Sequence, residues 1–569
     1  MSRKVVAASG YFNPLHYGHV SYLQKAKDAG SSLVVIVNND RQAQRKDTAS
    51  GLFVTMPARE RVKLIRSLAC VDAAFEAVDE DESVTETLRL LHPDAFANGG
   101  GRHATEKEKA VCLELGIELI EGLGIQHLVL QPYTQHYDWG KPRQVSIVGK
   151  LSPNDACEDD SPGTKKYAEL WMGDHPSGPS MVRQPNHLER KITLKDVLKR
   201  APSVLGEKLA TEAQLPFLLK VLSIHKALSI QAHPDRELAR RLHKERPDVY
   251  KDPNHKPEIA IALTDDFRAL CGFRPIPEII HFLETVPALE ALVGTGAKEE
   301  LTAALGDRTR EAAALKSAYT SMMHQPEEHA REQVRHLVET TRRAETHARV
   351  GEALDSVFES DDFSPPPRVV KLANGRAEDA EVFSLVCELH RQFGEDVGIF
   401  SVFFLNLVAM GVGECLYMPQ NTPHAYLSGD IVECMACSDN VVRGGLTPKY
   451  KDIEVLCEML NYAGGDVPCI KAENVEEGVK LYSDPSIEEF QVTHVHWKPG
   501  IKKRMCFSHN GPSLAFTCRG QGSVVICGEK EDLKPGVVFM LGAGVDADLS
   551  ADTELDVFVA CCPPHYFKH

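Results

Sequence analysis

Apolar and amphipathic segments alternate through the first 124 residues of the chain. A short apolar run covers 4–9, a helical pattern extends to about residue 28, and a second apolar run covers 31–40. Similar segments follow as helices over 57–68 and 83–91, a strand over 93–98, a helix ending near 115 and a strand over 117–122. Because strands that alternate with helices form parallel sheets covered by helices, residues 1–124 are predicted to be a Rossmann-like α/β domain.

From residue 125 onward the pattern is mainly that of β-strands, with one helical interruption. Strand-like apolar runs dominate 125–275 and 365–467, whereas 276–364 repeats Ala, Leu, Glu and Arg with helical periodicity. The last part, 468–569, contains short β runs at turn spacing, which is typical of a sandwich or jelly roll. The predicted fold is multidomain: an α/β domain, a mainly-β region with a helical insertion domain, and a C-terminal jelly-roll domain.

The composition narrows the class of protein. The chain has 569 residues, 43% hydrophobic and 25% charged, as expected for several soluble globular domains. The net charge of -17 argues against nucleic acid as a partner, and no apolar run approaches the roughly 20 residues that a membrane span needs. No signal-peptide pattern opens the chain, and the 15 cysteines are scattered, so we expect a cytoplasmic protein with free thiols.

One strand end in the β region carries candidate metal ligands. Gln231 and His233 lie two positions apart, so on a strand they project from the same face. Glu258 follows in a turn-like run. Oxygen and nitrogen ligands without a thiolate suit a catalytic zinc site with an open position. The alternative is a strand end with ordinary polar residues.

A second candidate site follows the first apolar run, in the segment GYFNPLHYGH at 10–19. His16 and His19 would stand at the start of a helix, where imidazoles and the helix dipole both favour phosphate. Gly10 would let the backbone approach a ligand, and Gly18 would leave room for a nucleotide. The alternative is a pair of surface histidines at an ordinary helix start.

This segment resembles the signature of the cytidylyltransferase-like nucleotidyltransferases, over about the first 120 residues. The resemblance implies a nucleotide site that includes Gly10, Phe12 and Gly18, with His16 and His19 stabilising the transferring phosphoryl group and Lys46 contacting phosphate. It also implies a nucleoside triphosphate substrate with Mg²⁺, and a phosphorylated sugar or polyol as acceptor.

The segment departs from that family in two places. Asn13 stands where the family usually has Asp, and Gly101 stands where an acidic residue is common. The RTEGIST-type segment of many cytidylyltransferases is absent from the sequence. The base and the acceptor therefore stay open, and an inactive nucleotide-binding or scaffold domain is the alternative.

Residues 125–569 resemble type I mannose-6-phosphate isomerase of the eukaryotic kind. The motifs are YAELWMGDHPSGPS, LPFLLKVLSIHKALSIQAHPD, NHKPEIAIALT, CGFRP and MPQNTPHAYLSGDIVECMACSDNVVRGGLTPKYKD, in that order. The family implies a zinc enzyme with two cupin-like domains and a helical domain, converting an aldose phosphate to a ketose phosphate through an enediol. This activity would feed GDP-mannose synthesis, with sugar phosphates as the partners.

The same resemblance implies roles for particular residues. The zinc ligands would be Gln231, His233, Glu258 and His424, and Arg443 would be catalytic. Further matching positions in the cleft are Lys220, Ser229, Lys256, Tyr426, Glu433 and Lys449, and Trp139 is expected as an aromatic wall or as simple packing. The general base stays open between a cleft carboxylate or lysine, such as Glu433, Lys256 or Lys449, and a metal-bound water. A non-catalytic sugar-phosphate-binding cupin is the rival interpretation.

Overall fold

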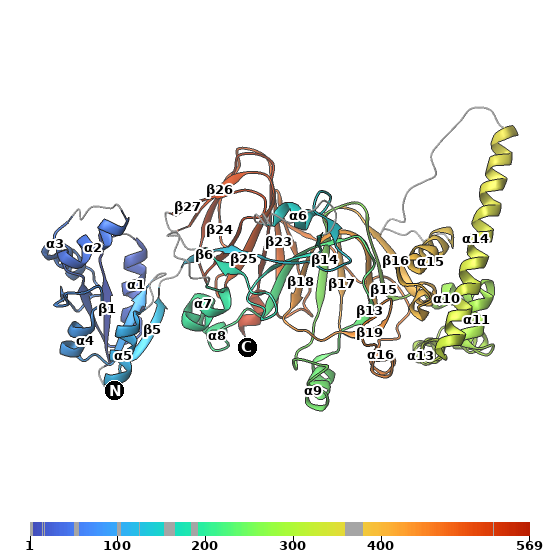
Figure 1. Ribbon diagram of the computed structural model, residues 1–569, viewed down its shortest axis with the longest axis horizontal. Helices are drawn as coiled ribbons and strands as arrows, with labels where there is room; N and C mark the ends of the chain where they lie inside the picture. The colour runs from blue at the N-terminus through green and yellow to red at the C-terminus, as the bar shows by residue number, and fades with distance from the viewer. Residues whose placement is uncertain are drawn as a thin grey trace.

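The computed structural model has three parts arranged along its long axis (Figure 1). It describes residues 4–13, 15, 17–50, 56–99, 104–123, 126–152, 165–183, 192–358, 379–526 and 529–568. An α/β unit lies at one end, a β-rich region lies in the centre, and a layer of helices lies at the other end. Among the described residues, no helix is both long enough and apolar enough to cross a membrane.

The N-terminal unit is a parallel sheet in the order β3-β2-β1-β4-β5, with helices on both faces. Its strands are β1 (Val5–Gly10), β2 (Ser32–Val37), β3 (Ala73–Glu76), β4 (Ala95–Gly99) and β5 (Glu118–Leu123). Its helices are α1 (Tyr17–Asp28), α2 (Asp40–Ser50), α3 (Ala58–Arg66), α4 (Thr85–Leu91) and α5 (Glu106–Leu115). The strand order reverses between β1 and β4. Doubly wound sheets bind ligands at such a point, outside the carboxyl ends of the strands, so these ends of β1 and β4 form a candidate ligand-binding edge.

The predicted elements of this unit are confirmed, and two were missed. Helix α2 has the polar sequence DRQAQRKDTAS, which lacks the apolar stripe that the sequence analysis relied on. Strand β3 spans four residues, AAFE, of which only Ala74 is fully buried. Short or polar elements of this kind are held by their neighbours rather than by their own periodicity.

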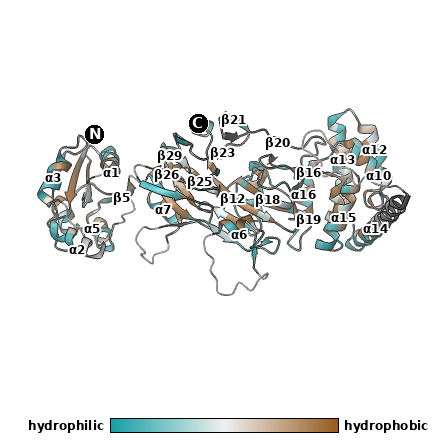
Figure 2. Ribbon diagram, turned by 90° about the horizontal axis from the view of Figure 1, so that it is seen from above, coloured by the Kyte–Doolittle hydropathy of each residue, from teal (hydrophilic) through white to brown (hydrophobic). Residues whose placement is uncertain are grey.

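The centre contains an 11-stranded sheet whose main path is β20-β17-β14-β18-β12-β10-β7. Its strands are β7 (Tyr133–Gln135), β10 (Glu169–Met172), β12 (Phe217–Ile224), β13 (Ile230–Ala232), β14 (Glu258–Ala262), β15 (Phe267–Phe273), β16 (Leu405–Met410), β17 (Cys415–Met418), β18 (His424–Ala436), β19 (Val442–Gly445) and β20 (Cys469–Ile470). Strand β18 pairs with β12, β13, β14 and β15, because its two halves join different parts of the sheet. Figure 2 shows these central strands as largely hydrophobic.

Two further sheets form the C-terminal jelly roll. The larger sheet has the order β11-β6-β28-β25-β30-β23-β22-β21, and the smaller has the order β24-β29-β26-β27. The larger contains β6 (His127–Gln131), β11 (Met181–Val182), β21 (Glu473–Glu476), β22 (Val479–Tyr482), β23 (Gln491–Trp497), β25 (Ser513–Arg519), β28 (Val538–Leu541) and β30 (Leu555–Cys561). The smaller contains β24 (Lys502–Met505), β26 (Gly522–Ile526), β27 (Glu529–Leu533) and β29 (Ala547–Ala551), and a separate pair is β8 (Lys141–Pro142) with β9 (Lys166–Tyr167).

Strands β6 and β11 differ from the expected division of the chain. Both fall within 125–275, yet β6 pairs with β28, so they complete the sheet of the C-terminal jelly roll. Their pairing with a strand about four hundred positions later leaves no local trace in the sequence. The mainly-β region is therefore two interleaved jelly rolls rather than two consecutive ones.

The helical layer packs on the far side of the central sheet. It contains α10 (Ile276–Thr285), α11 (Pro287–Val293), α12 (Ala297–Ala304), α13 (Arg308–Met323), α14 (Glu327–Phe358), α15 (Asp379–Phe393) and the 3-10 helix η2 (Val397–Phe403). Residues of α15 and η2 share one core with α10–α14, so the layer continues past the expected end at residue 364, which itself lies outside the described residues.

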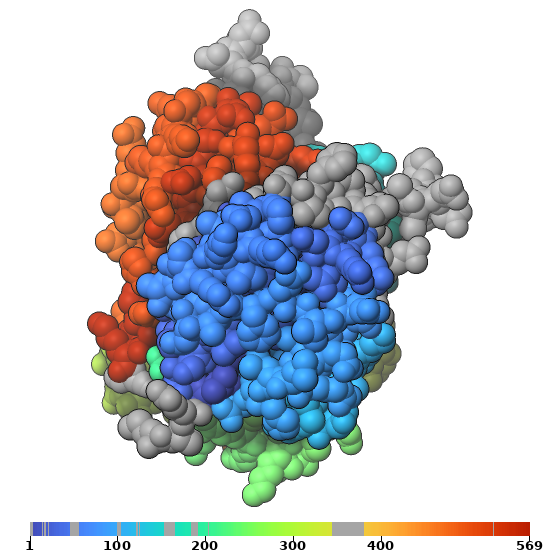
Figure 3. Space-filling model, turned by 90° about the vertical axis from the view of Figure 1, so that its left-hand side faces the viewer, coloured from blue at the N-terminus to red at the C-terminus, as the bar shows by residue number. Residues whose placement is uncertain are grey.

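The remaining helices are short and connect the strands. They are α6 (Ile147–Leu151), α7 (Leu194–Arg200), η1 (Pro202–Leu205), α8 (Glu207–Ala210), α9 (Arg236–Glu245), α16 (Ile453–Met459) and η3 (Pro564–Lys568). Edge strand β5 of the N-terminal unit contacts α7 and η1, which join the two units. Figure 3 shows the N-terminal unit in blue at this end of the molecule, with the C-terminal jelly roll in orange beside it.

Candidate metal centre

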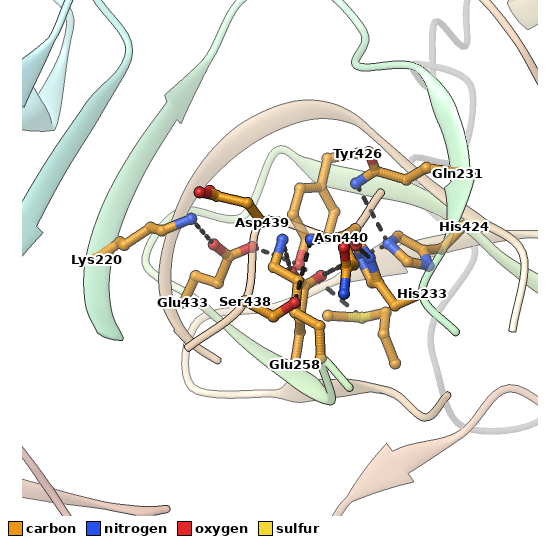
Figure 4. A network of polar contacts seen from close by, with 12 residues as sticks. Lys220, Gln231, His233, Glu258, His424, Tyr426, Glu433, Ser438, Asp439 and Asn440 are labelled. Atoms are coloured by element: carbon orange, nitrogen blue, oxygen red, sulfur yellow. Dashed lines mark hydrogen bonds and ion pairs between the residues drawn. The ribbon is translucent and has the colours of Figure 1, made fainter. Parts of the chain in front are cut away.

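Three strands bring the candidate metal ligands together. Gln231 on β13 is the Cα partner of His424 on β18, and His233 follows β13 directly. Glu258 opens β14, which pairs with the other half of β18. One donor atom from each of His233, Glu258 and His424 lies within 4.8 Å of the others. Figure 4 shows these three side chains and Gln231 directed toward one another.

Both imidazoles are oriented by backbone carbonyl groups. The Nδ1 atom of His233 lies 2.7 Å from the carbonyl oxygen of Asn440, and that of His424 lies 3.0 Å from the carbonyl oxygen of Thr422. A carbonyl only accepts, so Nδ1 carries the proton in both rings and Nε2 keeps its lone pair. Histidines that bind metals are commonly oriented in this way.

The free nitrogens face a carboxylate with which they form no hydrogen bond. His233 Nε2 lies 3.3 Å and His424 Nε2 lies 3.6 Å from Glu258 Oε2. His233 Nε2 and Glu258 Oε2 are buried and have no hydrogen-bond partner in the part of the chain that the structure describes. Because buried polar atoms are rarely left unpaired, two converging orphan atoms fit a divalent cation between them.

The protonation states agree with this interpretation. Burial lowers the pKa of His233 to about 4, so the ring is neutral at pH 7. Burial alone would raise the pKa of Glu258, but the ammonium of Lys256, at 2.7 Å from Oε1, and the imidazoles hold it well below its usual range. A neutral imidazole and an ionised carboxylate are the forms in which both side chains bind metal.

Gln231 lies at the edge of this cluster. Its Nε2 atom is 3.4 Å from His424 Nε2, and its Oε1 atom accepts a hydrogen bond of 3.4 Å from Ser229. The two ends of an amide exchange by rotation about the last side-chain bond, so Oε1 can face the imidazoles instead. Gln231 can therefore supply a neutral oxygen ligand.

A buried polar network adjoins the cluster. Lys220 donates a hydrogen bond of 2.9 Å to Glu433 and lies 3.6 Å from Glu169. Tyr426 donates to the other oxygen of Glu433 at 3.0 Å, and Trp171 donates to Glu169. Lys220 and Tyr426 were expected in the cleft, and in the structure both donate hydrogen bonds to Glu433 and fix its carboxylate.

Burial makes one carboxyl group of the network easier to protonate. Burial raises the pKa of Glu433, and the nearby Glu258 adds to the effect while Lys220 opposes it. Burial alone would lower the pKa of Lys220, but Glu433 and Glu169 raise it, so the ammonium stays charged. A carboxyl group with a raised pKa beside a candidate metal centre is suited to proton transfer.

Arg443 has a different environment. It lies on β19, where its Cα partner is Gln231, and it is partly buried. Within the described part of the chain its guanidinium forms neither an ion pair nor a side-chain hydrogen bond, and desolvation lowers its pKa. An uncompensated guanidinium at this position can bind an anionic group.

Aromatic residues and an exposed lysine lie near the buried network of Glu169 and Lys220. Trp139 stacks on Tyr137 at 5.8 Å between ring centroids, and the ammonium of Lys449 lies 6.0 Å from the Tyr137 ring. Lys449 is exposed, so it lies outside the buried cluster of candidate ligands. Burial and the negative charge of Glu169 raise the pKa of Tyr137 to about 12.

Several residues of the site were missed in the sequence. They are Tyr137, Glu169, His175, Asp439 and Asn440, each of which contacts a residue named above or lies beside one. Glu169 and His175 lie inside the motif YAELWMGDHPSGPS, which resembles the family, so their place in that motif was the available signal. Asn440 acts through its backbone carbonyl, which no side-chain pattern reveals.

The N-terminal candidate site lies at the end of β1. Phe12 has a positive φ of 51° and is buried, and its ring packs edge-on against His19 at 5.1 Å. A Cβ atom on Gly10 would lie 2.7 Å from the Phe12 ring, so Gly10 is required by this side chain rather than by a ligand alone. Gly18 lies in α1. Lys46 lies in α2, but its side chain and the whole of His16 lie outside the described residues.

Two asparagines at the same edge of the sheet have unpaired polar atoms. Asn98 on β4 is fully buried, and neither its Oδ1 nor its Nδ2 atom has a hydrogen-bond partner among the described residues. Asn38, which follows β2, leaves Oδ1 unpaired. The buried Arg61 donates to the carbonyl groups of Asn38 and Tyr11 at 2.8 and 2.7 Å. Arg61 is also paired with Asp40 at 2.8 Å, so this edge combines unused hydrogen-bonding capacity with a guanidinium that is held in place by its partners.

Two interleaved jelly rolls, with a buried His–Glu–His cluster in the central one, define a cupin-like protein with a candidate metal centre. Residues 128–276 match the family model "Phosphomannose isomerase type I, catalytic domain", and residues 292–405 match the helical insertion domain of the same family. Residues 7–116 match the cytidylyltransferase-like family, so the N-terminal unit is a cytidylyltransferase-like domain.

Known proteins support the same assignment. The chain is 38% identical to mannose-6-phosphate isomerase of Schizosaccharomyces pombe over 439 residues, covering 75% of this chain and 97% of that protein. The rat enzyme of the same name is 36% identical over 446 residues, covering 75% and 96%. A phosphomannose isomerase mutant structure from Salmonella typhimurium has the same fold, at 23% identity and a TM-score of 0.60 over 77% of this chain and 99% of that one. A zinc-bound mannose 6-phosphate isomerase structure aligns at 22% identity and a TM-score of 0.58, over 77% and 99%. The chain belongs to the type I phosphomannose isomerase family.

Proposed function

We propose that residues 125–569 form a zinc-dependent isomerase that interconverts mannose 6-phosphate and fructose 6-phosphate. The observation that carries the proposal is the buried cluster in which His233 Nε2 and Glu258 Oε2 converge without a hydrogen-bond partner. The names of the relatives supply the reaction, and the zinc-bound neighbour supplies the metal.

Four residues would hold the zinc ion: Gln231, His233, Glu258 and His424. The three donors of the central cluster bring one negative charge, from Glu258, and Gln231 adds a neutral amide. When bound, zinc supplies Lewis-acid stabilisation of the negative charge that develops on the substrate oxygens. The hydrogen bonds from Nδ1 to Asn440 and Thr422 keep both imidazoles directed at one point.

Proton transfer in this proposal falls to Glu433 or Lys256. The reaction removes a proton from C2 of the aldose and returns a proton at C1. Glu433 has a raised pKa and is held by Lys220 and Tyr426, so it can accept and release a proton at a fixed position. Lys256 is the second candidate, because it is buried and bonded to Glu258.

Arg443 would bind the anionic part of the substrate. Its guanidinium has no partner among the described residues, so it can stabilise the enediolate or the phosphate without breaking an existing pair. Lys449 lies farther out and can attract the sugar phosphate to the rim, where Trp139 and Ser229 also lie near the approach.

The test is formation of fructose 6-phosphate from mannose 6-phosphate by the full chain. Arg443→Met should lower kcat/KM on the order of 10²- to 10³-fold, while zinc content stays unchanged. The matched control is Arg241→Met, which removes an exposed arginine paired with Glu458. Wild-type protein that holds zinc but does not turn over mannose 6-phosphate would refute the proposal and favour a non-catalytic sugar-phosphate-binding module.

For the N-terminal domain we propose nucleotidyl transfer from a nucleoside triphosphate, with Mg²⁺, to a phosphorylated sugar or polyol. The supporting observation is the unpaired Asn98 side chain, buried where β4 ends beside β1. His19 lies in the first turn of α1, where the helix dipole favours a phosphate. His16, Gly18 and Lys46 keep their proposed roles from the family resemblance.

Pyrophosphate release measured with CTP, ATP and GTP, each with sugar or polyol phosphates, tests this activity. Replacing His16 and His19 by alanine should abolish the release, whereas Lys63→Ala, which removes an exposed pair with Glu60, should not. Release that survives both histidine substitutions would overturn their assigned role. No release with any acceptor would favour an inactive scaffold.

We further propose that the isomerase feeds GDP-mannose synthesis. Mannose 6-phosphate must first become a 1-phosphate before ordinary nucleotide activation, so a mutase-type step must stand between the two sites. Direct transfer of the isomerase product to the N-terminal domain is therefore not part of the proposal.

A further inference from the structure

The C-terminal jelly roll carries a second group of metal-binding side chains. His494 and His496 alternate on β23, so both project from the same face of the sheet. Asp556 on the neighbouring strand β30 is the Cα partner of His496. None of these residues contributes to the cluster on β13, β14 and β18.

The three side chains converge on one carboxylate oxygen. Asp556 Oδ1 lies 2.9 Å from His494 Nε2 and 2.8 Å from His496 Nδ1. The donor atoms of all three residues lie within 4.8 Å of one another. One carboxylate oxygen from β30 thus faces two imidazole nitrogens from the neighbouring strand β23, which is the arrangement of a three-ligand site.

The surrounding residues hold this arrangement in place. Arg519 donates to the other oxygen of Asp556 at 2.8 Å, which leaves Oδ1 to the imidazoles. The ring of His494 stacks on Phe558 with parallel planes, at 4.2 Å between centroids. Ligating carboxylates in metal sites are usually held by a second hydrogen bond of this kind.

The local charge also favours a cation. Asp556 is mostly buried and its pKa is held low, although burial opposes this, by both imidazoles and by Arg519. Glu554 lies 3.5 Å from His496 Nε2 and also pairs with Arg519. With neutral imidazoles, two carboxylates and one guanidinium leave a net negative charge at the site.

We propose that His494, His496 and Asp556 bind a borderline divalent cation such as Zn²⁺, at a site separate from the isomerase centre. Imidazole with a carboxylate is a ligand set that zinc, nickel and copper accept. Zinc bonds of about 2.0–2.1 Å in a tetrahedral site separate the donors by about 3.3 Å. Here two of the separations are 2.8 and 2.9 Å, so a shift of about half an ångström accommodates the ion in place of the shared hydrogen bonds.

The site is open on one side. The side chain of His496 is 44% exposed, so an ion can reach it from solvent and keep a water molecule as a fourth ligand. The cation would tie β23 to β30 through side chains as well as through the backbone pairing.

The test is zinc stoichiometry of the full chain after chelation, removal of the chelator and titration with Zn²⁺ alone. Wild-type protein should bind two ions per chain, and His496→Gln should bind one, with isomerase activity unchanged. His233→Ala should also bind one, because it removes the other site. The matched control His565→Ala replaces a histidine of the same domain whose Nε2 lies 3.2 Å from the Ile487 carbonyl oxygen, and it should keep two.

His496→Gln is chosen because His496 is half-exposed, so the fold should survive, and its melting temperature without metal checks this. A wild-type chain that binds only one zinc ion in excess Zn²⁺, lost with His233→Ala and kept by His496→Gln, would overturn the proposal. Equal binding by wild type and His496→Gln would overturn it as well. In either case the three side chains would be a hydrogen-bonded cluster only.

Discussion

The isomerase centre and the candidate site of the N-terminal domain differ in what surrounds their polar groups. In the first, His233, Glu258 and His424 come from strands and are almost completely buried, with a lysine–glutamate network beneath them. In the second, His19 and the start of α1 lie where a strand gives way to a helix, and the orphan polar atoms belong to neutral asparagines. The candidate ligands and these asparagines are all buried, so the two regions differ in charge: the first holds ionised groups that depend on their partners, whereas the second leaves neutral amides unpaired.

The same difference governs stability. In the central region the ionisable groups interact in a medium of low polarity, so each depends on its partner. In the N-terminal domain most ion pairs are exposed, as in Lys63–Glu60 and Lys107–Asp81, and water competes with them. Substitutions in the two regions should therefore differ in size and in pH dependence.

The largest expected effect is on Lys220. Lys220→Met leaves Glu433 and Glu169 buried without their cation, and should lower the free energy of unfolding by about 3–5 kcal/mol. The double variant Lys220→Met, Glu433→Gln should recover part of this loss, because one buried charge is removed. Urea denaturation measures both, and Lys63→Ala in the N-terminal domain should change stability by less than about 0.5 kcal/mol. Equal losses from both lysines would remove the contrast between the regions.

The next effect is on activity. His233→Ala removes a central ligand, and should reduce isomerase activity by at least about 10²-fold, since loss even of outer residues at metal sites costs up to that amount. Pyrophosphate release by the N-terminal domain should be unchanged in the same protein. A parallel loss of both activities would mean that the two regions are coupled.

A smaller effect concerns pH and Asp174, near the isomerase cleft. Burial raises the pKa of Asp174 to about 6, while the bonds from the Leu215 N–H group oppose the shift. The native state then holds the proton between about pH 4 and 6 more tightly than the unfolded state, so stability falls as pH rises through this window. Asp174→Asn keeps an acceptor for Leu215, and should be more stable than wild type by about 3 kcal/mol at pH 7 but equal to it below pH 4. Thermal unfolding across this range measures the difference, and a constant difference would exclude Asp174 as its source.

The smallest effect has the opposite sign and lies in the N-terminal domain. The ammonium of Lys107, with the hydroxyl and N–H groups of Ser83, lowers the pKa of Asp81 to about 2. The stabilisation is present above pH 4 and is lost as pH falls toward 2. Because Asp81 is 46% exposed, Asp81→Asn should cost less than about 1 kcal/mol at pH 7. A cost that persists unchanged at pH 2 would contradict this origin.

The sequence predicted the parts of this molecule that depend on local pattern or on long motifs. The strand-and-helix order of residues 1–124 follows from periodicity, and Gln231 with His233 follows from two-residue spacing on a strand. Long-range features left no such signal. The pairing of β6 with β28 joins segments that are far apart in the chain. The group that orients His233 is the backbone carbonyl of Asn440, which every residue type has, so the sequence does not mark it.

Residue roles that depend on close packing also could not be predicted from the sequence. Gly10 appears in a nucleotide-binding signature, and the structure gives it a second reason, since the Phe12 ring occupies the space of a Cβ atom. Tyr426 and Lys220 belong to two motifs that suggest substrate contact, and the structure gives each a second role, since both donate hydrogen bonds to Glu433. Whether a polar side chain faces a ligand or another side chain depends on which strand covers it.

The long strand β18 has a consequence for the order in which the protein is made. Lys220 and Glu433 are 213 positions apart, so at a synthesis rate of about 5–20 residues per second, roughly 10–40 s separate their emergence from the ribosome. All five strands of the N-terminal domain precede this interval, and that domain can fold as soon as it emerges. Strand β12 can pair with β10, which is made before it, but its other edge must wait through the synthesis of the whole helical layer for β18. The newborn chain thus carries a finished domain beside an apolar strand with one open edge, and such an edge is prone to aggregation until β18 pairs with it.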